Sequence, residues 1–227
     1  MNGDLDFQPL SGGRTFMNGD LAVKGSEING VIDAILANGL VFQAEHQHLY
    51  DFEPIVWFIH IRGQGDPIKL AQALYRVLKA TSTPLPQAPP ADPSTPLNPD
   101  RLKSTLHGFD VEVGSDGVVT VYVARHNPIY INGVRVSPAT NIATNVAFEP
   151  LNSSGTKVAV VPDFGMVAGE VNPVVGTMRA QGWDIGSLYN QETDEHPQLY
   201  FSHDLKVGDP YVLAQEVRNG LNQTNSK

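Results

Sequence analysis

The chain has 227 residues, of which 41% are hydrophobic and 17% charged, and 15 basic residues stand against 24 acidic ones. A net charge of -9 lacks the basic footprint that binding to a phosphate backbone needs, so nucleic acid is not an expected partner. The absence of cysteine excludes disulfides, thiolate catalysis and cysteine metal sites, and no run approaches the length of a membrane span.

The first part of the chain predicts a helix, a hairpin and a second helix. A helical apolar stripe follows Ser26 and ends before Gly39: Ile28, Val31, Ile32, Ile35 and Leu36. Two β-rich runs, 40–48 and 54–62, are joined by a short polar connection that indicates a hairpin. Asp66 then precedes a proline in the pattern of a capped helix start, and apolar residues recur after it with helical spacing.

Two kinds of segment follow. Residues 83–99 contain seven prolines, a composition that predicts an exposed linker with extended or poorly ordered backbone. Residues 100–147 are expected to form a bridging helix and a β-meander, with turns at Ser115-Asp116-Gly117 and Asn132-Gly133. Arg125 and His126 end one strand of this meander, where we expect both to be exposed.

The second half of the chain repeats the first at a constant offset of 143 positions. This offset matches Asp20 with Asp163 and His60 with His203. It also matches longer motifs: Glu27-Ile28-Asn29 with Glu170-Val171-Asn172, and Gly65-Asp66-Pro67 with Gly208-Asp209-Pro210. Such self-similarity indicates a duplicated structural unit.

The duplication predicts an α+β fold of two tandem βαββα-like repeats. Their antiparallel sheets are covered by helices and joined by the Pro-rich linker and the β-meander. The predicted divisions are 1–82 for the first repeat, 83–99 for the linker, 100–147 for the bridging helix and meander, and 148–227 for the second repeat.

Metal-ligand residue types are concentrated in the first copy. His46 and His48 alternate along a predicted strand and therefore project to one face. His60 joins them if the hairpin pairs even positions with even ones, and Glu53 begins the returning strand. Three imidazoles and a carboxylate predict a site for zinc, manganese, iron, nickel or copper. The alternative is that these histidines only form hydrogen bonds on an ordinary sheet face.

The second copy is poorer in ligands. The residues that align with the first-copy set are Tyr189, Gln191, His196 and His203. A phenol and an amide are poor replacements for imidazoles, so we expect this copy to be degenerate. Asp20 and Asp163 either bond the next turn or orient histidines as partners outside the ligand set.

Several motifs together resemble one known family. They are Phe16-Met17-Asn18-Gly19-Asp20-Leu21, Glu45-His46-Gln47-His48-Leu49, Phe58-Ile59-His60, Val161-Pro162-Asp163-Phe164 and Tyr200-Phe201-Ser202-His203. Over almost the whole chain the sequence is similar to the LppY/LpqO domain family (DUF1259), bacterial proteins of unknown function that often carry export or lipoprotein signals. The resemblance implies that His46, His48 and His60 match the family's His-Asn-His element and its later histidine.

In the second copy, Tyr189-Asn190-Gln191 keeps only the central asparagine of that element. The sequence leaves the compartment unknown, and the resemblance makes export one option, with any signal sequence absent from this chain. Two main functions are compatible with the sequence: a protein that binds a metal or small polar ligand at the first-copy site, and a metal-dependent enzyme acting there on a small organic substrate. A purely structural module would follow if the histidines were exposed. The pattern does not indicate an oligomeric state.

Overall fold

The computed structural model describes residues 3–50, 53–86 and 91–226. By its internal contacts the chain forms two compact units. Unit 1 comprises Met1–Gln87, Ile129–Ile142 and Asn190–Glu195, and unit 2 comprises Ala88–Pro128, Ala143–Tyr189 and His196–Lys227. The division of the sequence into two repeats, a linker and a bridging segment was based on the duplication, not on internal contacts. It therefore stays a prediction.

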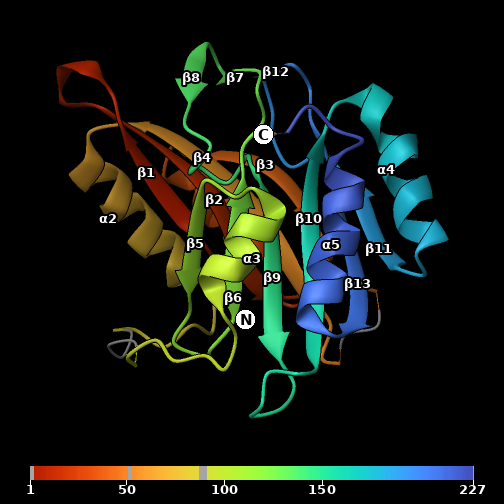
Figure 1. The fold of residues 1–227 in the computed structure, drawn as a ribbon. Coiled ribbons are helices and arrows are strands. Elements are labelled where there is room, and N and C mark those ends of the chain that lie inside the picture. Colours follow the sequence, from red (N-terminus) through yellow and green to blue (C-terminus); the bar gives the residue numbers. More distant parts are fainter. Residues whose placement is uncertain (1–2, 51–52, 87–90, 227) are drawn as a thin grey trace. The chain divides into compact units, whose positions relative to one another are not determined.

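Unit 1 is built on an antiparallel sheet of four strands in the order β1-β2-β4-β3. Its main elements are β1 (Leu5–Pro9), β2 (Thr15–Lys24), α1 (Ile28–Ala37), β3 (Val41–His46), β4 (Val56–Gly65) and α2 (Pro67–Leu78), with a short 3-10 helix at Ser11–Gly13. Apolar residues of β2 and β4 pack with α1 and α2 in one core, and α2 lies along the sheet in Figure 1. The opposite face carries the buried polar residues of β2 and β4 together with Phe16 and Phe58.

A small second sheet also belongs largely to unit 1. Strands β7 (Ile129–Ile131) and β8 (Val134–Val136) form a hairpin. The two-residue strand β12 (Glu195–His196) extends it in the order β12-β7-β8, and Glu195 is the residue of β12 that unit 1 contains.

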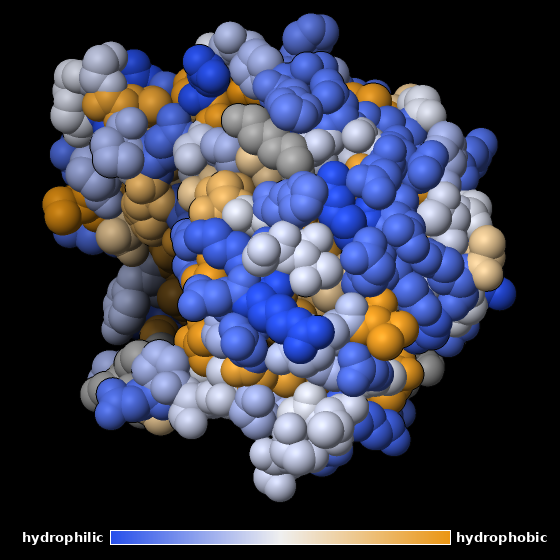
Figure 2. Space-filling model, viewed as in Figure 1, coloured by the Kyte–Doolittle hydropathy of each residue, from blue (hydrophilic) through white to orange (hydrophobic). Residues whose placement is uncertain are grey.

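Unit 2 contains a six-stranded sheet in the order β11-β13-β10-β9-β6-β5. Its elements are α3 (Pro99–Leu106), β5 (Asp110–Val113), β6 (Val119–Val123), β9 (Thr144–Pro150), β10 (Val158–Met166), α4 (Ala168–Ala180), β11 (Asp184–Tyr189), β13 (Tyr200–Gly208) and α5 (Pro210–Leu221). The three helices and the sheet share one core around Trp183, Phe148 and Phe164. Their outer surface is mainly hydrophilic, with smaller hydrophobic patches (Figure 2).

The two sheets repeat one topology, which confirms the predicted α+β fold. Strands β9, β10, β13 and β11 have the same order in their sheet as β1, β2, β4 and β3. In both copies one helix follows the second strand along the chain, β2 or β10, and another follows the last strand, β4 or β13. Asp66 and Asp209 both accept backbone hydrogen bonds at the start of the last helix of their copy. Strands β5 and β6 extend only the second sheet.

The matched glutamates Glu27 and Glu170 explain another shared motif. Each carboxylate ties the start of its helix to the segment that follows the last helix of the same copy. The backbone N–H groups that donate to them occupy equivalent positions: Lys24 (2.8 Å) and Ser82 (2.6 Å) for Glu27, and Val167 (2.9 Å) and Asn225 (2.8 Å) for Glu170. The repeated acid is therefore a structural clamp rather than a sign of chemistry.

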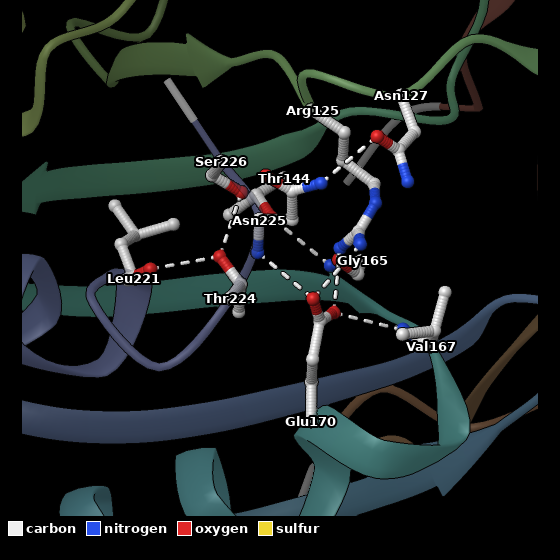
Figure 3. Close-up of polar contacts among 10 residues, drawn as sticks. All are labelled: Arg125, Asn127, Thr144, Gly165, Val167, Glu170, Leu221, Thr224, Asn225 and Ser226. Carbon is white, nitrogen blue, oxygen red and sulfur yellow. Dashed lines mark hydrogen bonds and ion pairs between the residues drawn. The ribbon is translucent and has the colours of Figure 1, made fainter.

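Unit 2 adds a buried arginine to its clamp, as Figure 3 shows. Arg125 donates through Nη1 and Nη2 to the two oxygens of Glu170, at 2.7 and 2.9 Å, and through Nη1 to the carbonyl oxygen of Gly165 at 2.9 Å. The Arg125 side chain is only 2% exposed. The expectation of an exposed Arg125 was thus wrong. Both carboxylate oxygens of Glu170 accept hydrogen bonds from the guanidinium, which allows it to be buried in the fold.

The Pro-rich segment contains no helix or strand at residues 83–86 and 91–98, and α3 begins at Pro99. Residues 87–90 lie outside the described part of the chain. Leu97 departs from the exposed linker that was expected, because it is buried in the unit 2 core. Among the described residues, no helix has the length and apolar character needed to cross a membrane.

Candidate functional site

The polar face of the unit 1 sheet results from strand alternation. On β4, apolar residues face the helices, while His60 and Arg62 project to the other side. On β2, Asn18 pairs with Arg62 and Asp20 pairs with His60. All four side chains are buried, so this face is covered rather than open to solvent.

Three imidazoles gather on this face. The ring of His46 lies 5.0 Å from the ring of His48 and 5.0 Å from the ring of His60, measured between centroids. One ring nitrogen of His46 lies within 4.8 Å of one of His48. The hairpin pairs His46 with Phe58 and Ala44 with His60, so it meets the condition of even pairing under which His60 joins the cluster. The ring nitrogens of His46 and His48 lie close enough together to share a metal ion.

The structure places His48 and Glu53 differently from the sequence prediction. Strand β3 ends at His46, so His48 reaches the cluster from a bend rather than by strand alternation. Its ring stacks on Phe58 with 3.4 Å between centroids. Glu53 is exposed before β4, and the structure records no hydrogen bond or ion pair for it within the described chain. Its role as a fourth ligand stays a prediction.

Burial sets the protonation of the cluster. Desolvation lowers the pKa of His46 to about 3, and burial together with His46 and His48 lowers the pKa of His60 well below its usual value. These imidazoles are therefore neutral at pH 7, which is the form that coordinates metals. Asp20 lies 3.9 Å from His60, measured from Oδ2 to Nε2, and burial raises its pKa to about 7.

Beside the histidines lies a polar network that the sequence reasoning missed. Asn18 donates to Glu192, and Gln43 connects Asn18 with Arg62. Asn18 belongs to a motif noted in the sequence, but Gln43 and Glu192 carry no recognisable pattern. Their pairing depends on a chain segment that is 174 positions from Asn18, so only the tertiary structure reveals it.

The second-copy counterparts are divided between the units. In unit 2, the Tyr189 hydroxyl lies 2.7 Å from His203 Nε2, and His203 Nε2 lies 3.8 Å from Asp163 Oδ1. His196 is exposed, whereas Gln191 belongs to unit 1 and donates to the carbonyl oxygen of residue 141. A phenol thus replaces one imidazole of the first copy. The expectation of a degenerate copy stays a prediction.

A comparison with family models matches residues 1–80 and 107–223 to one described as a Domain of Unknown Function (DUF1259). The chain belongs to the DUF1259 family. Membership confirms the resemblance noted in the sequence, and the matched residues include the histidine cluster, the strands of the three sheets and the helices α1, α2, α4 and α5. No curated protein matches the chain.

This DUF1259 chain has another buried acid, on the helix-facing side of β13 in unit 2. Asp204 is completely buried, and its Oδ1 accepts a hydrogen bond of 2.8 Å from the hydroxyl of Ser202. Its Oδ2 receives no hydrogen bond from the described residues. Desolvation raises the pKa of Asp204 to about 7, so the acid is largely protonated below that pH.

We predict that Asp204→Asn stabilises the protein at pH 8 but not at pH 4. The unfolded chain releases this proton near pH 3.8, whereas the folded chain keeps it until about pH 7. Folded-state stability is therefore lost as pH rises through this window, by roughly 4 kcal/mol in total. Urea unfolding at pH 4, 6 and 8 should show that the variant lacks this loss. The control is Asp184→Asn on the exposed part of β11, and identical pH profiles for wild type and Asp204→Asn would contradict the prediction.

Proposed function

We propose that the protein binds one divalent transition metal per chain at His46, His48 and His60. The observation that carries this proposal is the convergence of the three rings, with His46 5.0 Å from each of the others. His46 and His60 are buried and neutral at pH 7, so no proton competes with a metal for their ring nitrogens. A surface group of hydrogen-bonding histidines would not share these properties.

The chemistry of the donor set fits such an ion. Imidazole nitrogens suit zinc, iron, nickel and copper, and with a carboxylate they also suit manganese, whereas calcium and magnesium prefer oxygen ligands. Asp20 lies near His60, where a carboxylate can orient an imidazole and raise its basicity. The matched pair of Asp163 and His203 shows that this acid accompanies the histidine in both copies.

The second candidate function is a metal-dependent enzyme that acts on a small organic substrate at the same site. Three protein ligands leave a coordination position for water or substrate. This candidate is supported by two buried acids near the cluster, Asp20 and Glu192, whose pKa values are raised to about 7 and about 8. Acids that titrate near neutral pH are suited to proton transfer, although structural networks also contain them.

Calorimetric titration of the metal-free protein with zinc and with manganese tests the proposal. We expect one strong site per chain at pH 7.5 for at least one of these metals. Elemental analysis of protein purified without a nickel column should show a bound transition metal in comparable amount. Absence of metal from the purified protein together with no binding in either titration would favour ordinary hydrogen-bonding histidines.

A further inference from the structure

The second repeat of the sequence contributes a segment to unit 1 that we call the strap, residues 191–194. Three side chains of the unit 1 sheet hold it. Asn18 donates to Glu192 Oε1 at 2.7 Å, Gln43 accepts from the backbone N–H of Thr193 at 3.2 Å, and Arg62 donates to Asp194 at 3.1 Å. The strap is therefore fixed at several points along its length.

These anchors place the carboxyl of Glu192 against Asn18, whose row on the sheet is next to that of Asp20 and His60. Asn18 is two residues before Asp20 on β2, so the two lie on one face about 7 Å apart along the strand. Asp20 in turn lies next to His60. Glu192 thus contacts the row next to that of Asp20 and His60, and Asn18, Asp20 and His60 are all buried.

Glu192 is unusual within this network. It is only 5% exposed. Its Oε1 accepts the hydrogen bond from Asn18, but its buried Oε2 receives none within the described chain. The adjacent amide of Gln43 donates to Asn18 and also interacts with Glu192, which lowers the pKa of that carboxyl. A buried carboxyl that is only half satisfied is costly unless a further interaction uses it.

A divalent metal on the histidines would supply that interaction. Neutral imidazoles provide no negative charge, so the ion would bring two positive charges into a buried region. Asp20 can compensate one of them. We propose that Glu192 compensates the other from outside the ligand set, so that the second repeat of the sequence sets the metal affinity of the first-copy site. This inference rests on the proposed function.

Metal binding should then release the proton of Glu192. Burial, opposed by hydrogen bonds with Asn18 and Gln43, raises the pKa of this carboxyl to about 8; the charge of Glu195 contributes to the rise and that of Arg62 opposes it. Among the described residues, other charged groups at this face include Asp20 on β2, Asp4 and Asp6, whose charges raise the pKa of Asp20, and Asp194 of the strap, which pairs with Arg62. A nearby divalent cation favours the ionised form, so about one proton should leave Glu192 when zinc binds at pH 7.

Zinc titration calorimetry in two buffers of different ionisation enthalpy tests this proposal, because it gives both the affinity and the number of protons released. Glu192→Gln resembles the protonated acid in shape, and its circular dichroism and urea midpoint at pH 6 should match wild type. We expect it to bind zinc 10- to 100-fold more weakly and to release about one proton fewer. Glu192→Asp keeps the charge and should restore the proton release.

Glu45→Gln is the matched control, since it removes the same charge from an exposed position next to His46. It should bind zinc and release protons as the wild type does. Unchanged affinity and proton release in Glu192→Gln, with normal binding by the wild type, would overturn the role of Glu192 and leave the proposed metal site intact. No binding by the wild type would overturn both.

Discussion

Replacing His46 and His48 together by alanine should weaken zinc binding more than about 100-fold, beyond the loss typical of a change outside the ligand set. The two rings are 5.0 Å apart, and each has a nitrogen within 4.8 Å of one of the other's. The double variant removes two of three proposed nitrogen ligands and leaves His60 with little affinity for a metal of its own. Titration calorimetry at pH 7.5 measures this loss.

The control for this variant is the double replacement of His126 and His196 by alanine. Both histidines are exposed, so the control removes two imidazoles without touching the cluster. It should bind zinc with wild-type affinity. Retention of tight binding by the folded His46 and His48 double variant would show that the metal site lies elsewhere.

A second large effect is expected from Arg125→Met in unit 2. Burial alone would raise the pKa of Glu170, but hydrogen bonds from Arg125, Val167 and Asn225 hold it below its usual value. Removing one member of a buried ion pair typically costs about 3–5 kcal/mol, because the partner is left uncompensated. The substitution also removes the hydrogen bond that Arg125 donates to the carbonyl oxygen of Gly165 (Figure 3). Urea unfolding at pH 7 should show a free energy of unfolding that is lower by a corresponding amount.

Arg179→Met is the matched control for that substitution. Arg179 pairs with Asp184 and donates to the carbonyl oxygen of Trp183, but the side chains of Arg179 and Asp184 are 56% and 67% exposed. An exposed pair contributes about 0–1 kcal/mol, so this variant should remain close to wild type. Equal stability losses for the two arginine variants would mean that the buried pair of Arg125 and Glu170 stabilises the fold no more than an exposed ion pair does.

The duplicated fold was predictable because its signals are local. Apolar stripes, the capping acids Asp66 and Asp209 and a constant offset report the order of elements directly. Glu27 and Glu170 also stood out as a repeated pair, although the sequence did not show that they clamp a later segment. Periodicity can locate such a residue but cannot name its distant partner.

The candidate site was predictable only in part. The even pairing of the hairpin brought His46 to His60 as strand alternation implied, whereas His48 arrives from a bend after the strand. The strap was beyond sequence reasoning, since Glu192 belongs by sequence to the second repeat and by contact to unit 1. The same limit applied to Arg125, whose burial depends on a carboxylate 45 positions away.

Anomalous diffraction at the zinc absorption edge, from crystals of the metal-loaded protein, tests the central claim most directly. We expect one strong peak per chain, about 2.0–2.1 Å from ring nitrogens of His46 and His48. Its intensity should disappear below the edge, which identifies the element. A well-ordered histidine cluster with no anomalous peak, or a single peak at other residues, would contradict the metal site proposed for this protein.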